Sequence, residues 1–151
     1  MLEKITMKNA IPEISHPNPS PEQIAGILER TKKIAIIGIS PKESRDSNRV
    51  ARYLMEQGYE VVPVNPGQRE ILGKACFKTI QDIPFPVDMA NLFLNPARVL
   101  PVVDQAVKKA VPVIWMQESV VHNEAAQRAR EADIQVVMNL CIMKEHKKWL
   151  I

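Results

Sequence analysis

The sequence predicts an α/β fold in which a mostly parallel, doubly wound sheet lies between two layers of helices. Short apolar runs rich in β-branched residues, such as residues 34–39, are typical of strands buried on both faces. Amphipathic segments with helical spacing alternate with these runs. Strands that alternate with helices favour right-handed crossovers and therefore a three-layer fold. We expect six strands in the order 3-2-1-4-5-6, with a short third strand.

The expected elements follow one another along the chain with few ambiguities. Ser20 is a good N-cap residue, Pro21 suits the first position of a helix, and Gln23 completes a capping box, so a helix is expected from there to Arg30. The strands are expected over 34–39, 60–65, 74–77, 88–94, 113–116 and 134–138. Further helices are expected over 50–55, 99–107, 123–132 and 144–150, with Asn123 as the N-cap of the 123–132 helix.

Length and composition indicate one globular domain. A chain of 151 residues can bury an independent core but is too short for two ordinary domains. Hydrophobic residues at 46% and charged residues at 25% exclude a disordered, collagen-like or coiled-coil chain as the main class. We expect residues 20–151 to form the domain and residues 1–19 to form a flexible N-terminal arm. A net charge of +3 is too small to indicate nucleic acid as a partner.

Cysteine usage and the N-terminus predict a cytoplasmic protein. Cys76 and Cys141 are too few for a disulfide framework and lack the spacing of a zinc site. No apolar run approaches the roughly 20 residues that span a bilayer, so we expect no membrane partner. The N-terminal residues lack the apolar stretch of a secretory signal. Three scattered histidines predict no metal site.

Ligands of such sheets bind beyond the carboxyl ends of the strands, where the strand order reverses. Polar, glycine-bearing or proline-bearing loops leave the strands at this edge. The residues nominated by topology alone are Gly38, Ser40, Asn65, Asn95 and Gln117. Asn65 and Asn95 have an alternative interpretation as simple turn residues. Gln117 can equally serve to satisfy a strand end.

The loop after the first strand is the most informative of these segments. It has Gly38 but lacks the other glycines of a dinucleotide-binding turn, and Asn65 stands where NAD-binding proteins have an acid, so ordinary NAD binding is disfavoured. Ser47 lies at a helix start, which attracts phosphate, and Arg45 can grip an anion with two hydrogen bonds. The loop therefore favours a multiply phosphorylated nucleotide. The loop also carries Lys42, and the alternative is that Ser47 only caps the helix and the arginines, Arg45, Arg49 and Arg52, form a solvated face.

Catalytic signals are weak throughout the chain. Cys141 is followed by Lys144, Glu145 and His146, which suggests a nucleophile and a base, but a single cysteine after a buried strand more often serves packing. No catalytic triad and no pair of carboxylates is recognisable. We expect no catalytic residues.

Several motifs resemble one known family when they are taken in order. They are Ile36-Ile37-Gly38-Ile39-Ser40-Pro41-Lys42 with Arg45 and Ser47, Val50 to Leu54, Gly58 to Pro66, Ile71-Leu72-Gly73, Asp82-Ile83-Pro84, Val87-Asp88, Trp115-Met116-Gln117, and Asn139-Leu140-Cys141 through His146. The chain resembles the small stand-alone CoA-binding proteins, which are related to the CoA-binding domain of the succinyl-CoA synthetase alpha subunit. The resemblance covers about residues 30 to 148.

The resemblance implies a Rossmann-like domain that binds coenzyme A, usually with no catalytic activity. It implies that Gly38, Ser40, Arg45 and Ser47 approach the phosphates of the cofactor. The full set of implied binding residues is Gly38, Ile39, Ser40, Lys42, Arg45, Ser47, Asn65, Pro66, Leu94, Asn95 and Gln117. Coenzyme A or an acyl-CoA is the expected partner, and a second copy of the chain or a partner enzyme subunit stays open.

The chain also departs from the family pattern. Many members have glycine two positions after the residue matching Gln117, whereas this chain has Glu118 and Ser119. Ala110 and Asp133 also stand where glycine is frequent. Two alternatives to a non-catalytic sensor, carrier or accessory protein stay open, and the altered segment after Gln117 favours the second of them. One is a nucleotide-dependent enzyme, related to acyl-CoA ligases or to NADP-type oxidoreductases. The other is an interaction module with a degenerate pocket.

Overall fold

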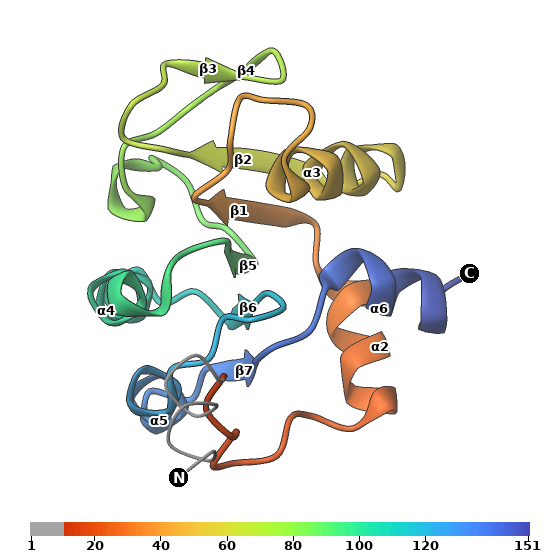
Figure 1. Ribbon diagram of the computed structural model, residues 1–151, viewed down its shortest axis with the longest axis vertical. Helices are drawn as coiled ribbons and strands as arrows, with labels where there is room; N and C mark the ends of the chain where they lie inside the picture. The colour runs from red at the N-terminus through yellow and green to blue at the C-terminus, as the bar shows by residue number, and fades with distance from the viewer. Residues whose placement is uncertain (1–10) are drawn as a thin grey trace, which may run out of the picture.

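A computed structural model describes residues 11–151 as one parallel five-stranded sheet between two layers of helices (Figure 1). Residues 1–10, which hold about half of the expected N-terminal arm, lie outside the described residues. The strands of the sheet are β1 (Lys33–Ile37), β2 (Glu60–Val64), β5 (Met89–Leu92), β6 (Val113–Met116) and β7 (Gln135–Val137). Their order is β2-β1-β5-β6-β7 and every pair is parallel. The predicted α/β class and its doubly wound topology are confirmed.

The expected third strand over 74–77 is reduced to a single bridge. Glu70–Ile71 and Lys74–Ala75 form a separate antiparallel hairpin of two short strands, β3 and β4. Leu72 and Gly73 join them with φ angles of 56° and 73°, which is the backbone geometry of a tight hairpin turn. The segment therefore pairs with itself. Only Phe77 reaches the main sheet, through a parallel bridge to Val64 on β2, at the place where the third strand was expected.

Two helix layers cover the sheet (Figure 1). One face is covered by α4 (Val99–Lys108) and α5 (Asn123–Glu131), the other by α2 (Pro21–Arg30), α3 (Asp46–Glu56) and α6 (Ile142–Trp149). Alternate residues of each strand enter opposite cores, so Ala35 and Ile37 pack beneath α4 while Ile34 and Ile36 pack beneath α2 and α3. Two short 3-10 helices, η1 (Ile80–Asp82) and η2 (Pro96–Arg98), complete the fold. Among residues 11–151, no helix is both long enough and apolar enough to cross a membrane.

The helix start at Ser20 has the predicted capping box. The Ser20 side chain accepts a hydrogen bond from the Gln23 amide, and the Gln23 side chain accepts one from the Ser20 amide. Ile24, Ile27 and Leu28 are buried on the side facing the sheet.

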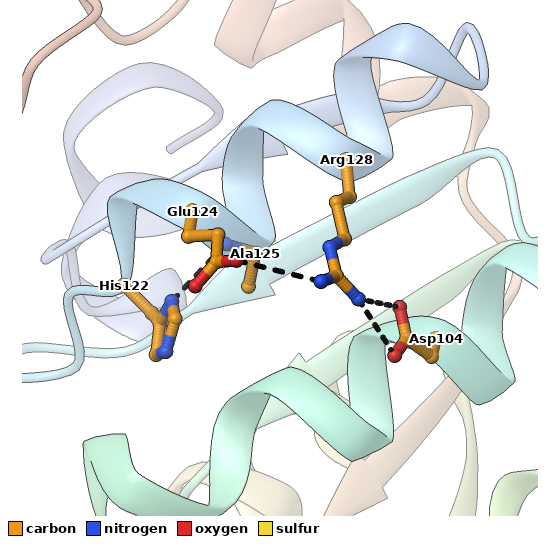
Figure 2. Close-up of polar contacts among 5 residues, drawn as sticks. All are labelled: Asp104, His122, Glu124, Ala125 and Arg128. Atoms are coloured by element: carbon orange, nitrogen blue, oxygen red, sulfur yellow. Dashed lines mark hydrogen bonds and ion pairs between the residues drawn. The ribbon is translucent and has the colours of Figure 1, made fainter.

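The predicted N-cap of α5 is wrong by one residue. The ring nitrogen Nδ1 of His122 accepts a hydrogen bond from the Ala125 amide at 3.0 Å, so His122 is the cap (Figure 2). Asn123 lies inside the helix, and its side chain instead binds the backbone of Ser15 and Glu13. Arg128 on α5 donates to both carboxylate oxygens of Asp104 on α4, at 3.1 and 3.2 Å, which ties the two helices of this layer together (Figure 2).

The chain before α2 runs along the β7 side of the domain. Asn18 donates to the carbonyl of Met138 at 2.9 Å and accepts from the Met138 amide at 2.8 Å. Met138 directly follows β7, which is an edge strand of the sheet. The two bonds satisfy backbone groups of Met138 that could otherwise pair with another chain.

Two positions at which the resemblance leads us to expect glycine have left-handed backbone. Ala110 follows α4 with a φ of 58°, and Asp133 follows α5 with a φ of 62°. Each residue ends its helix and turns the chain into the next strand. Glycine is the usual residue at such a position because it has no Cβ.

Candidate functional site

Two pockets lie side by side at the carboxyl edge of the sheet. We call the first, of about 660 Å³, the α3 pocket, and the second, of about 440 Å³, the α4 pocket. Gly38, Phe93 and Leu94 line both, so the ends of β1 and β5 form the divide between them. This is the point at which the strand order reverses, where ligands of such sheets bind.

Gly38 is required by a close approach of two backbone segments. Its φ is +87°, and a Cβ at this position would lie 2.1 Å from the carbonyl oxygen of Phe93. The Gly38 amide donates to the Val64 carbonyl at 3.0 Å. Any side chain here would push the ends of β1 and β5 apart and deform the divide between the pockets.

The loop after Gly38 is hydrogen-bonded onto the start of α3. The Ser40 amide donates to Oγ of Ser47 at 2.9 Å, and Asn48 donates to the Ser40 carbonyl at 2.9 Å. The α3 N-cap is Arg45, whose side chain makes no capping bond. Ser47 lies within α3 and is not its N-cap, so the capping part of that alternative is wrong, whereas Arg45 and Arg49 are exposed as its other part expects. Ser47 and Ser40 both keep a hydroxyl proton that can be donated into the α3 pocket.

The cations of this loop differ in what they already bind. Arg49 pairs with Asp46 at 2.8 Å, and Arg52 donates to the Asn48 side chain and the Glu43 carbonyl. Arg45 lines the α3 pocket and forms no ion pair with any residue in the described range. Lys42 is exposed and lines neither pocket. Arg45 is therefore the cation of the loop best placed to meet an anion in the α3 pocket.

Gln117 lies under the α3 pocket and joins three elements. Its side chain is 4% exposed, and Oε1 accepts one hydrogen bond from Asn91 Nδ2 at 3.0 Å and another from the Ile142 amide at 3.1 Å. It thus connects the end of β6 with β5 and with the first turn of α6. The interpretation of Gln117 as a residue that satisfies buried polar groups is supported by these contacts, and the same residue also lines the pocket.

The two departures after Gln117 form one wall of the α3 pocket. Glu118 pairs with Lys144 at 2.7 Å, so its negative charge is balanced within the site, and this hydrogen bond raises the pKa of Lys144. Ser119 has a φ of 71°, and its amide donates to Oδ1 of Asn139, which itself has a φ of 60°. The backbone at Ser119 thus has the left-handed conformation that glycine adopts most readily.

The first turn of α6 completes the α3 pocket, and sequence reasoning did not place it there. Cys141, Met143 and Lys144 all line this pocket, and Cys141 is buried at 7% exposure. The order of the elements could have predicted this, because α6 follows β7 and the carboxyl end of β7 lies at the same edge of the sheet. Phe93 and Val120 add further apolar lining.

The α4 pocket contains the remaining predicted residues, Asn65, Pro66, Leu94 and Asn95. Asn65 donates to the Ile39 carbonyl at 2.8 Å and accepts from the Gly67 amide, while Asn95 accepts from the Ala97 amide. Both asparagines therefore shape their turns as well as lining the pocket. Ile39 is fully buried and lines neither pocket. Residues missed by sequence reasoning are Lys78, Thr79, Arg98 and Gln105.

Within the part of the chain that the structure describes, no group of three histidine, cysteine or acidic side chains could hold a metal ion. The polar lining of the α3 pocket consists of hydroxyl, guanidinium, ammonium, amide and carboxylate groups. The cationic and hydroxyl groups among them suit the binding of an anionic ligand.

Comparisons with known proteins identify the family and the fold. The family described as "CoA binding domain" matches residues 32–147. An uncharacterised protein of Bacillus subtilis, YneT, is 36% identical over 129 residues, which cover 85% of this chain and 96% of that protein. A hypothetical protein from Pyrococcus horikoshii with a solved structure has a TM-score of 0.87 and 42% identity, covering 93% of this chain and 100% of that one. The fold is thus the Rossmann-like fold that the resemblance implied.

Larger enzymes share part of the same sequence. The ADP-forming acetate–CoA ligase I of Archaeoglobus fulgidus is 39% identical over 70 residues, which cover 46% of this chain but 10% of the ligase. The chain therefore corresponds to a small portion of that enzyme.

Proposed function

The chain belongs to the CoA-binding domain family, and on this premise we propose that it binds coenzyme A or an acyl-CoA through its phosphates at the carboxyl edge of the sheet. In this proposal the protein is a non-catalytic sensor, carrier or accessory protein. The observation that carries the proposal is the first turn of α3, which lines the α3 pocket together with Arg45, a cation without an ion-pair partner in residues 11–151. Helix starts and arginine side chains both favour phosphate groups.

The two pockets suit the parts of coenzyme A. The diphosphate would lie at the α3 pocket, facing Arg45 and the hydroxyls of Ser40 and Ser47. The adenosine part would enter the α4 pocket, beside Asn65, Pro66, Leu94 and Asn95. Gly38 and Leu94 line both pockets, so one ligand could extend across the divide. Both volumes lie within the range of roughly 300–1,000 Å³ usual for ligand sites.

The acyl or thiol end of the ligand would lie toward Gln117 and the first turn of α6. This part of the α3 pocket is lined by Val120, Cys141 and Met143, which supply the apolar contacts that an acyl chain needs. The neutralised Glu118–Lys144 pair leaves no unbalanced negative charge at this wall.

Thermal unfolding with coenzyme A, acetyl-CoA and NADP in parallel tests the proposal. A ligand at about 100 times its dissociation constant stabilises a protein by about 2.7 kcal/mol, a shift of several degrees at this chain length. We expect stabilisation by coenzyme A and acetyl-CoA but not by NADP. Stabilisation by NADP alone would favour the oxidoreductase alternative, and no shift with any of the three would favour an interaction module.

The Arg45→Ala variant tests the assigned phosphate site. Loss of a charge-assisted contact is worth about 1.5–3 kcal/mol, so the dissociation constant for coenzyme A should rise by more than tenfold. Lys32→Ala is the matched control because Lys32 is an exposed cation just before β1, at the opposite edge of the sheet. Unchanged affinity in Arg45→Ala, measured by calorimetry, would contradict the site.

A further inference from the structure

The α3 pocket has three cations, and two of them are paired with acids that also line the pocket. Arg49 pairs with Asp46 at 2.8 Å, and Lys144 pairs with Glu118 at 2.7 Å. The third cation, Arg45, is the one that the proposed function assigns to the diphosphate. The lining therefore has one more cation than acids, and a diphosphate, with a negative charge on each phosphate, exceeds this surplus.

The Glu118–Lys144 pair joins two segments of the pocket wall whose backbone is held in place. Glu118 follows the end of β6, in a turn closed by the hydrogen bond from the Val120 amide to the Gln117 carbonyl at 2.9 Å. Lys144 lies in the first turn of α6. Oε1 of Gln117 accepts from the Ile142 amide at 3.1 Å, so Gln117 connects the turn with the start of α6. The two charged side chains therefore start from ordered positions on adjoining segments of the wall.

The residues next to this pair in the sequence make the wall apolar. Val120 and Cys141 are buried, Met143 is half-buried, and all three line the pocket. A carboxylate at this wall would lose hydration and meet the negative charge of Glu118, while both other acid-paired and diphosphate-bound cations of the described lining are already occupied. An uncharged acyl chain would leave the ion pair intact and bury apolar surface.

We infer that the α3 pocket selects acyl-CoA thioesters with an uncharged acyl group over those whose acyl group ends in a carboxylate. The inference rests on the proposed function and deepens it, because it names the class of acyl group. Glu118 is the specificity-determining residue. It pairs with Lys144, the cation at this wall that could otherwise receive a carboxylate, and its own negative charge repels one.

Calorimetric titration with two pairs of ligands tests the inference. The pairs are propionyl-CoA with malonyl-CoA and butyryl-CoA with succinyl-CoA, and in each pair a methyl group is replaced by a carboxylate. Glu118→Gln removes the acid and frees Lys144, whereas Lys144→Met leaves the acid unpaired. The matched control is Glu124→Gln, which removes the acid of another exposed ion pair, with Arg128, and which lines neither pocket. Thermal unfolding of the free proteins verifies that each variant is folded.

Wild type should bind the uncharged ligand at least threefold more tightly than its carboxylate counterpart in one or both pairs. In Glu118→Gln the affinity for that carboxylate ligand should rise by about three- to fivefold, as expected for a partly exposed ion pair, while the affinity for the uncharged ligand changes by less than twofold. In Lys144→Met the affinity for the carboxylate ligand should fall further, because Glu118 then repels it without a partner. The control variant should keep the wild-type ratios.

The outcomes separate this inference from the proposed function. Equal affinities of wild type within both pairs would overturn the selection of uncharged acyl groups while leaving coenzyme A binding intact. Unchanged ratios in Glu118→Gln would also overturn the inference, since the preference would then have another origin. Binding of coenzyme A without binding of any of the four thioesters would overturn the inference alone. Absence of binding by coenzyme A and by all four thioesters would overturn the proposed function and this inference with it.

Discussion

Replacement of Gln117 by Met tests whether this side chain holds the α3 pocket together. Methionine is also unbranched and flexible, so the change removes the amide with little change of shape. Oε1 of Gln117 accepts from Asn91 Nδ2 and from the Ile142 amide, and all three residues are buried. The variant leaves two buried donors without an acceptor, and each costs about 1–3 kcal/mol of folding free energy. We expect the free energy of unfolding to fall by about 2–6 kcal/mol.

A double-mutant cycle with Asn91→Ala separates this effect from simple loss of packing. Asn91→Ala removes the donor to Gln117 and also removes Oδ1, a buried oxygen that has no partner among the described residues. Gln117 still accepts from Ile142 in that variant, so its cost should be smaller than that of Gln117→Met. In the double variant the Asn91 donor is absent, so it is not left without an acceptor. The fall in the free energy of unfolding of the double variant should therefore be smaller than the sum of the two single falls, by about 1–3 kcal/mol.

Urea unfolding followed by circular dichroism measures these quantities, because the free energy of unfolding falls linearly with denaturant concentration. A loss below about 1 kcal/mol in Gln117→Met would refute the argument, since stranding even one buried donor costs at least that much. Additive losses in the double variant would equally show that Asn91 and Gln117 do not act as a pair.

Two further predictions concern the divide between the pockets and the packing of α6. Gly38→Ala should lower the free energy of unfolding by about 2–5 kcal/mol, because the new Cβ combines left-handed backbone with a clash against the Phe93 carbonyl. Urea unfolding measures this change. A loss within about 0.5 kcal/mol would show that the ends of β1 and β5 move apart freely. The second prediction concerns His146, which is buried between Tyr53 and Tyr59. The hydroxyl of Tyr53 lies 2.7 Å from Nδ1 of His146. Burial lowers the pKa of His146 from 6.5. The unfolded chain therefore binds the proton more readily, so stability should decrease as the pH falls below about 6.5 and toward the lower pKa of the folded state. In His146→Gln this part of the pH dependence should vanish; if urea unfolding of wild type and variant changes equally over that range, the attribution to His146 is wrong.

Most of the fold was predictable because its signals are local. The buried β-branched runs and the capping box at Ser20 each depend on residues within a few positions of one another. The left-handed backbone at Ala110 and Asp133 was not predicted, because neither position has the glycine that usually marks such a turn. The prediction of a third strand was wrong for an equally local reason. The turn at Leu72 and Gly73 pairs residues 74–75 with residues 70–71, so they do not join the main sheet.

The candidate site was predictable as an edge of the sheet but not as a set of contacts. Parallel strands bring the residues after each strand to one edge, which is why Gly38, Ser40 and Gln117 were nominated from topology and do line the α3 pocket. What each side chain binds depends on partners far away in the sequence. The bond from the Ser40 amide to Ser47, and the place of Ser47 inside α3 rather than at its N-cap, are visible only in three dimensions.

Local pattern thus decided the order of elements and the edge at which a ligand would lie. The tertiary structure decided the division of that edge into two pockets and the neutralisation of Glu118 by Lys144. The reason is physical: periodicity and capping act over one or two turns of chain, whereas charge balance and pocket shape arise from segments that only folding brings together.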